Sequence, residues 1–130
     1  TKLKAGDTAY IESEMARITD ICREFSVVSK VIFENCYLTE DEKKTLCHIA
    51  TKVKPDFIKT STGFGTGGAT FEDVALMKRE TEGSGVKIKA AGGIRTLKTA
   101  LEMINLGVSR IGSTSSVAIM EEYMAHSPLL

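Results

Sequence analysis

Several residue types and patterns are scarce in this sequence, and each absence narrows the range of functions. The chain of 130 residues has no Trp, two Pro and three Cys. Its 17 basic and 17 acidic side chains cancel, so no excess of charge indicates nucleic acid or an anionic membrane as a partner. No apolar run approaches the roughly 18 residues of a membrane span. We therefore expect an ordinary globular protein with no nucleic-acid and no membrane partner.

The cysteines bear on the compartment and on metal binding. Cys22, Cys36 and Cys47 are odd in number and form no C-x-x-C pair. This argues against a disulfide framework and against a zinc site, and each cysteine is interpreted as a small buried hydrophobe. No signal peptide opens the sequence. We expect a cytoplasmic protein without a bound metal.

Short β-prone runs recur at near-equal spacing, and a helix signal follows each of them. A further helix signal precedes the first run. Strands that alternate with helices of this length predict a parallel sheet with right-handed crossovers. The expected strands are residues 28–34, 56–62, 86–91 and 109–113. The expected first residues or N-caps of the helices are Asp7, Thr39, Thr70, Thr96 and Ser116.

Two architectures have this pattern, an open doubly wound sheet and a closed (β/α)8 barrel, also called a TIM barrel. Alternation along a strand places Phe57 and Lys59 on one face, and Lys87 and Lys89 on one face of the next strand. Both faces of an open sheet lie under helices, where unpaired lysines would be costly. In a barrel the same positions open onto the mouth of the active site. The lysines therefore favour a barrel, of which these four units supply about half, since a whole barrel takes roughly 250 residues.

Residues 56–65, DFIKTSTGFG, form the strongest chemical motif. Lys59 lies late in a strand, before three hydroxyl residues and a glycine loop. A lysine acts as a nucleophile only when it is neutral, so its pKa must be lowered. Lys89 on the next strand lies about 5 Å away, and two ammonium groups about 4 Å apart repel by roughly 4 kcal/mol at an effective dielectric near 20. This pairing predicts that one of the two lysines has a lowered pKa.

Two glycine-containing turns are typical of a phosphate site. Residues 90–96, AAGGIRT, and residues 112–116, GSTSS, each lead a strand into a helix. Glycine permits close approach of the backbone, and free N–H groups at the start of a helix attract anions. The loops after the last two strands are also where such barrels commonly bind phosphate.

A dinucleotide fingerprint is a competing interpretation of one loop. Gly63, Gly65 and Gly68 satisfy G-x-G-x-x-G between a strand and a helix. However, Lys59 on the preceding strand is unusual for that motif, and the next strand ends in Lys89 and small residues without the acidic ribose ligand. We therefore favour the lysine chemistry.

The runs KVIFENCYL, DFIKTSTGFGTGGAT, VKIKAAGGIRT and RIGSTSS together resemble deoxyribose-phosphate aldolase, in order and over nearly the whole chain. The resemblance implies that residues 1–130 are the C-terminal half of one (β/α)8-barrel domain, with strands five to eight. It implies cleavage of 2-deoxy-D-ribose 5-phosphate to glyceraldehyde 3-phosphate and acetaldehyde, without metal or cofactor. Lys59 would form the Schiff base, Lys89 would perturb it, and Lys30 would line the pocket. The residues expected to hold the phosphate are Thr62, Gly63, Gly92, Gly93, Thr114 and Ser115.

The sequence also departs from the family in ways that leave alternatives open. The proton-relay Asp of the family belongs to a strand that would precede Thr1, and Asp7 is no substitute for it. Phe64 stands where some members have a lysine. The chain could therefore be a catalytically silent half barrel, or a different Schiff-base aldolase. We expect an oligomer, formed with an N-terminal half or by self-association, because a half barrel leaves two sheet edges unpaired. It would also leave the inward apolar residues Ile32 and Phe57 without an opposite wall to cover them.

Overall fold

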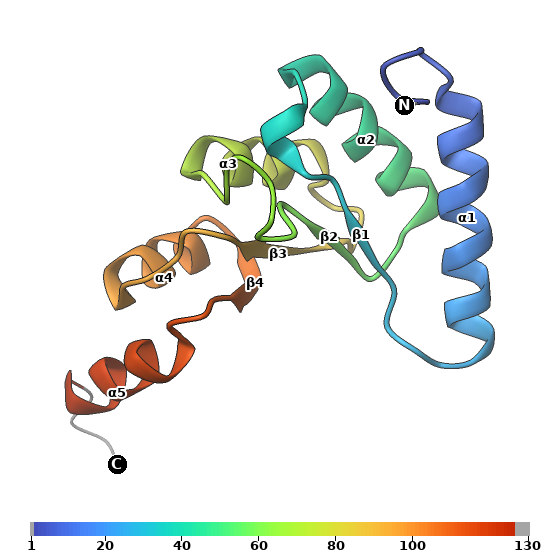
Figure 1. The fold of residues 1–130 in the computed structure, drawn as a ribbon. Coiled ribbons are helices and arrows are strands. Elements are labelled where there is room, and N and C mark those ends of the chain that lie inside the picture. Colours follow the sequence, from blue (N-terminus) through green and yellow to red (C-terminus); the bar gives the residue numbers. More distant parts are fainter. Residues whose placement is uncertain (1, 127–130) are drawn as a thin grey trace.

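Each predicted strand and helix is present in the computed structural model, which describes residues 2–126 (Figure 1). Strands β1 and β2 are shorter than the predicted runs, β3 begins one residue later than predicted, and β4 keeps its predicted length but begins one residue earlier. The elements are α1 (Thr8–Glu24), β1 (Lys30–Ile32), the 3-10 turn η1 (Asn35–Tyr37), α2 (Glu40–Val53), β2 (Phe57–Lys59), α3 (Phe71–Glu80), β3 (Lys87–Ala91), α4 (Leu97–Asn105), β4 (Val108–Gly112) and α5 (Ser116–His126).

The helices begin where the sequence predicts them. Thr39 accepts a hydrogen bond from the Glu42 N–H, and the Glu42 carboxylate accepts one from the Thr39 N–H, which completes a capping box on α2. Asp7, Thr70 and Thr96 cap α1, α3 and α4 with their side-chain oxygens. These caps satisfy N–H groups that have no partner inside the helix.

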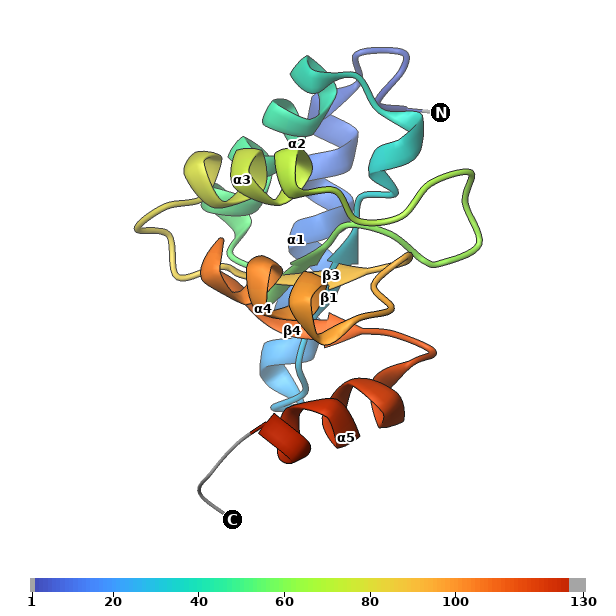
Figure 2. The same ribbon diagram turned by 90° about the vertical axis from the view of Figure 1, so that its left-hand side faces the viewer.

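Strand order decides between the two architectures. All neighbouring strands are parallel, and their order is β1-β2-β3-β4, the same as their order in the chain. In a doubly wound sheet the order in which successive strands are added reverses part-way, so the spatial order of the strands differs from their order in the chain. The sequential order, with helices α1 to α4 on one side of the sheet, is that of a barrel segment (Figures 1 and 2).

The two faces of the sheet differ in character. Ile58, Ile88 and Ala90 are fully buried and pack into the core beneath the helices. The alternate residues lie on the other face, which no helix within residues 2–126 covers; we call this the open face. The prediction that its apolar residues Ile32 and Phe57 would be uncovered is only half right. Ile32 is 44% exposed, but Phe57 is only 5% exposed because cationic side chains fold over its ring.

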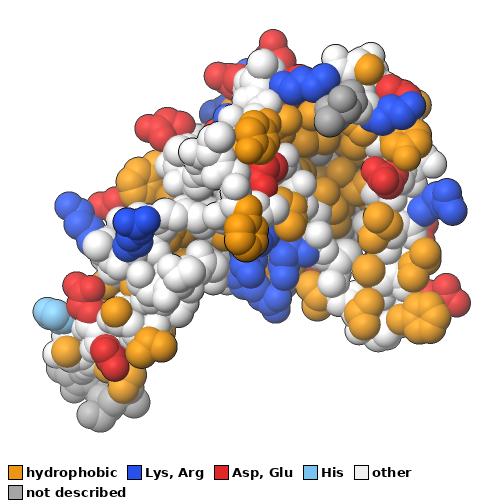
Figure 3. All heavy atoms as spheres, viewed as in Figure 1, with side chains coloured by type: hydrophobic (Ala, Val, Ile, Leu, Met, Phe, Trp, Pro, Cys, Tyr) orange, Lys and Arg blue, Asp and Glu red, His pale blue; other side chains and the backbone are white. Residues whose placement is uncertain are grey.

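Apolar side chains also remain uncovered near both edges of the sheet. On α1, Met15 is buried, but Ile18 is exposed, as is Phe25 directly after the helix. Figure 3 shows hydrophobic side chains gathered on the surface around α1. Near the β4 edge, Leu101 and Ile104 of α4 are exposed along a groove shared with α5. The hydrophobic pattern of these helices is therefore wider than the surface that the chain itself can cover.

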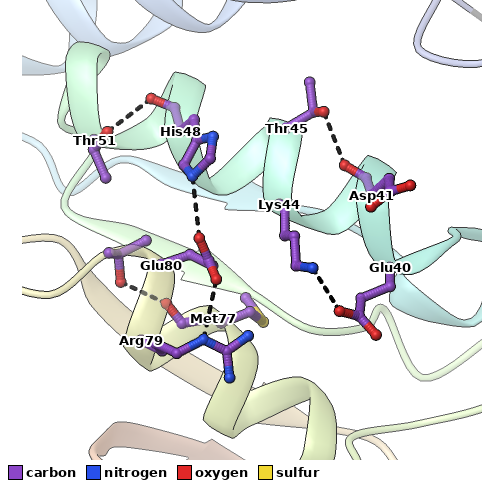
Figure 4. Close-up of polar contacts among 10 residues, drawn as sticks. Glu40, Asp41, Lys44, Thr45, His48, Thr51, Met77, Arg79 and Glu80 are labelled. Carbon is purple, nitrogen blue, oxygen red and sulfur yellow. Dashed lines mark hydrogen bonds and ion pairs between the residues drawn. The ribbon is translucent and has the colours of Figure 1, made fainter.

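The histidines and cysteines lie on helices, in the core or in partly buried positions outside the strands. His48 is exposed on α2 and contacts Glu80 of α3 at 3.1 Å, and Arg79 contacts the same carboxylate (Figure 4). His126 is the last residue of α5. Cys47 is fully buried, as predicted, but Cys22 and Cys36 are only half-buried.

Between residues 2 and 126, no helix is long and apolar enough to span a bilayer. The same residues contain no group of three or more His, Cys, Asp or Glu side chains arranged to hold a metal ion.

Candidate active site

The two lysines of interest stand opposite each other on neighbouring strands. Lys59 of β2 pairs in register with Lys89 of β3, and a bulge between Ile88 and Lys89 then brings Lys89 opposite Arg110 of β4. Neighbouring parallel strands are about 4.8 Å apart. The adjacency predicted from the sequence is therefore present.

Lys89 has the more confined environment of the pair. Its side chain is half-buried and lies against Gly112, where an added Cβ would meet Lys89 Cε at 3.2 Å. Burial lowers the pKa of Lys89, and the neighbouring charges of Lys30, Lys59 and Arg110 lower it further. Glycine at position 112 thus leaves room for a lysine that gives up its proton more readily than usual.

The open face is strongly positive. Lys30, Lys87 and Arg110 place their charged groups 5.9, 5.8 and 4.5 Å from the centre of the Phe57 ring, within the range of cation–π attraction. Lys59 and Lys89 lie on the same face. Among residues 2–126, none of these five cationic side chains forms an ion pair. The face therefore offers positive charge to whatever approaches it.

A cavity of about 300 Å³ lies at the carboxyl ends of β2, β3 and β4. It brings together Lys59 and most of the residues predicted to hold phosphate. Of the predicted residues, Lys30, Lys89 and Ser115 do not line it. Its lining residues are Lys59, Thr62, Gly63, Ala91, Gly92, Gly93, Ile94, Arg95, Gly112, Ser113 and Thr114.

Sequence reasoning missed Arg95 and Ser113 as lining residues. Arg95 adds a positive charge to the cavity and forms no ion pair within residues 2–126. The sequence could have indicated this role, because Arg95 follows the glycine turn after β3, with only Ile94 between. The Ser113 hydroxyl donates to the Ile94 carbonyl and accepts from the Ser115 N–H at 2.9 Å. This serine joins the turns after β3 and β4, which sequence spacing could not reveal.

The loop after β2 and the turn after β3 are in direct backbone contact. A Cβ added to Gly68 would lie 2.3 Å from the Gly92 carbonyl oxygen, so only glycine fits there. The Ala69 N–H donates to the carbonyl oxygens of Ala91 and Gly92 at 3.1 and 3.0 Å. The last glycine of the G-x-G-x-x-G pattern therefore serves loop packing in this fold.

Curated relatives and solved structures agree with this geometry. No protein-family model matches the chain. Deoxyribose-phosphate aldolases of Lactobacillus acidophilus and Thermococcus kodakarensis are 55% and 51% identical over 93% and 92% of the chain, which covers 51% and 53% of their lengths. The chain matches the C-terminal half of deoxyribose-phosphate aldolases. Among solved structures, one titled "QR15, an Aldolase" matches 95% of the chain with a TM-score of 0.85 and 42% identity, and the chain covers 55% of it.

The same comparisons fix the fold class. The deoxyribose phosphate aldolase of Aeropyrum pernix, described as tetrameric, matches 92% of the chain at 26% identity with a TM-score of 0.82. The chain spans about half the length of the relatives and structures that it matches. With its sequential parallel sheet, it is a half of a (β/α)8 barrel, as predicted.

Proposed function

We propose that residues 1–130 are the C-terminal half of one aldolase barrel domain and supply the Schiff-base lysine and the phosphate pocket for cleavage of 2-deoxy-D-ribose 5-phosphate. One observation carries the proposal: Lys59 lines the same cavity as the glycine turns after β2 and β3. A substrate that carries an aldehyde and a phosphate needs an amine and an anion site within one cavity. Arg95 and the turn glycines supply the anion site, and Lys59 supplies the amine.

The proposed reaction uses the lysine as an electron sink. The neutral Lys59 amine adds to the C1 aldehyde, and water leaves to form an iminium ion. Loss of the C3 hydroxyl proton breaks the C2–C3 bond, whose electron pair moves into the enamine on Lys59. Carbons 3 to 5 leave as glyceraldehyde 3-phosphate. Protonation and hydrolysis of the enamine then release acetaldehyde and restore the amine, so the sequence as written requires neither metal nor redox cofactor.

Lys89 and Lys30 have supporting roles in this proposal. Lys89 stands opposite Lys59, and burial together with the charges of Lys30, Lys59 and Arg110 lowers its pKa beside the nucleophile. Lys30 adds positive charge to the open face, where it adjoins Phe57 and contributes to the lowered pKa of Lys89. Neither lines the phosphate cavity, so both are proposed to act on the lysine chemistry instead of on the phosphate.

The charge of the open face bears on the proposed partner. If two copies of the chain closed a barrel together, each copy would contribute the five cations of its open face to the barrel interior. Two like charges 4 Å apart repel by about 4 kcal/mol at an effective dielectric near 20. An N-terminal half that carries carboxylates, including the relay Asp of the family, would instead neutralise them. We therefore favour that half over a second copy inside the barrel, with further oligomers formed through the outer surface, in the cytoplasm.

A retro-aldol assay tests the proposed function. The chain is assayed alone and after mixing with a segment that encodes strands one to four of a relative. Cleavage of 2-deoxyribose 5-phosphate is expected with the segment, which would supply the proton-relay Asp of the family, and very low activity is expected without it.

The same assay with fructose and sedoheptulose phosphates separates this activity from that of another Schiff-base aldolase. Preferential cleavage of either phosphate would contradict the proposed substrate. No cleavage of any substrate by the assembled barrel would support the catalytically silent alternative. Fractionation of the source cells would test the cytoplasmic location.

A further inference from the structure

Glu34, between β1 and η1, has a left-handed backbone conformation with φ 56° and ψ 61°. Residues with a Cβ seldom adopt this conformation, and it persists only where the surroundings hold it. Here the flanking Phe33 and Asn35 N–H groups donate to the carbonyls of Lys59 and Thr60, each at 2.9 Å. The turn is thus fixed along β2, and the Glu34 side chain is directed at the loop that follows that strand.

Both oxygens of the Glu34 carboxylate bind Thr62. The Thr62 N–H donates to Oε1 at 3.0 Å, and the Thr62 hydroxyl donates to Oε2. The hydroxyl oxygen of Thr62 in turn accepts from the Phe64 N–H at 3.1 Å. These bonds occupy the N–H groups on either side of Gly63 and fix the peptide between them.

Of the three consecutive N–H groups of residues 62–64, only that of Gly63 remains free to donate. Gly63 has φ +99°, and its N–H donates to no group of residues 2–126. Gly63 lines the phosphate cavity, whereas Glu34 does not. The carboxylate therefore holds the loop from outside the cavity while the free N–H belongs to a residue inside it.

The rest of the loop depends on the same turn. A Cβ added to Gly65 would lie 2.8 Å from Cys36 Sγ and 3.2 Å from Glu34 Cδ, so the loop packs directly on the turn. Phe64 is 97% exposed and gives the loop no apolar anchor. Glu34 is accordingly the main polar contact that fixes the tip of this loop.

We propose that Glu34 is the positioning residue of the phosphate cavity, because it fixes Thr62 so that the Gly63 N–H is available to a phosphate oxygen. This inference rests on the proposed function and deepens it. Glu34 acts through Thr62 and does not touch the substrate. Thr62, whose own donors are engaged by Glu34, then shapes the cavity without donating to the phosphate.

Binding of inorganic phosphate to the 15N-glycine-labelled chain, assembled with an unlabelled segment that supplies strands one to four, tests this role. The chain has 11 glycines, so the amide spectrum is simple. Phosphate should shift the Gly63 signal in the unchanged protein. In E34Q a neutral amide replaces the carboxylate. Its oxygen can still accept from the Thr62 N–H, but its NH2 must donate to the Thr62 hydroxyl, so both charge-assisted bonds are lost and the hydroxyl changes from donor to acceptor. The apparent phosphate affinity should fall about tenfold, and most of the Gly63 response should be lost.

Two variants separate positioning from a general loss of stability. E34G relieves the left-handed strain and keeps the fold, but it should lose the Gly63 response as E34Q does. The matched control is E42Q, which weakens a carboxylate that accepts hydrogen bonds from Thr39 and Lys4 far from the cavity, and it should keep the response. Reduced binding in E34Q and E34G with normal binding in E42Q would support the proposal.

Two outcomes would overturn it. Equal phosphate affinity and an equal Gly63 shift in all four proteins would remove the role of Glu34 and leave the proposed aldolase function intact. No phosphate response at Gly63 in the unchanged protein would overturn both this role and the proposed phosphate site. In that case, trapping of an aldehyde on Lys59 would still test the lysine chemistry separately.

Discussion

At the scale of single residues, Lys89 is the group whose protonation matters most for the open face. Its pKa is lowered first by burial and then by the charges of Lys30, Lys59 and Arg110. The folded chain therefore binds fewer protons at this site than the unfolded chain does. By linkage, the contribution of Lys89 to stability rises with pH between its lowered folded-state pKa and its ordinary pKa near 10.4.

K89M should therefore stabilise the chain at neutral pH, because methionine fills similar space without the penalised charge. Urea unfolding of both proteins between pH 7 and pH 10 checks this. The advantage of K89M should shrink as pH rises, since the neutral lysine carries no penalty. K98M, which changes a lysine on α4 away from the open face, serves as the control. A K89M protein that is less stable than the parent at pH 7 would contradict the argument.

The pairing of Lys59 with Lys89 was predictable from the sequence because the side-chain period of two in strands is strict. The burial that lowers the pKa of Lys89 was not predictable, and neither was the position of Arg110, which stands opposite Lys89 because of the β3 bulge. The contact between Glu34 and Thr62 was equally hidden. It requires a left-handed turn at a non-glycine residue, for which the sequence has no reliable sign.

At the scale of elements, the loop after β2 and the turn after β3 act as one unit through Gly68 and Gly92. G68A would place its Cβ 2.3 Å from the Gly92 carbonyl oxygen, so the backbones must separate. We expect a loss of about 1–3 kcal/mol in the free energy of unfolding, which urea denaturation would measure.

G67A is the graded control for this change. Its Cβ would meet only the Cβ of Cys36, at 3.2 Å, where a small side-chain adjustment suffices. Its loss of stability should be smaller than that of G68A. Equal losses of stability in the two variants would show that the contact with the Gly92 backbone is not what requires glycine at position 68.

Caps and element order were the most predictable parts of the fold. Thr39, Thr70 and Thr96 combine a side-chain acceptor with a following helical pattern, which is local information. Burial was less predictable because it depends on what lies across from a side chain. Phe57 was expected to be uncovered, but three long cationic side chains fold over it, which only their three-dimensional positions determine.

At the scale of the whole molecule, the uncovered edges predict association. Within the described part of the chain, strands β1 and β4 each lack a neighbour on one side, and exposed apolar residues such as Ile18, Phe25 and Ile104 lie near them. Burying such a side chain contributes roughly 1.5–3 kcal/mol, against a total stability of about 5–15 kcal/mol for a domain. The chain alone should therefore not persist as a well-packed monomer.

Sedimentation at micromolar concentration tests this expectation. Alone, the chain should sediment as species larger than 14.1 kDa, and with a carboxylate-bearing N-terminal half it should form a one-to-one complex. High salt should weaken that complex, because screening reduces the attraction between the cationic face and the added carboxylates. A compact 14.1 kDa monomer that unfolds cooperatively would contradict the expectation.

The central claim is that Lys59 is the amine that forms the Schiff base. Acetaldehyde and borohydride, added to the chain assembled with strands one to four, should fix an ethyl group on Lys59, located by peptide mass spectrometry. K59M should abolish this adduct, while K87M, which changes another lysine of the open face, should leave it in place. Absence of the adduct in the assembled barrel, or an adduct on Lys89 in place of Lys59, would contradict the account.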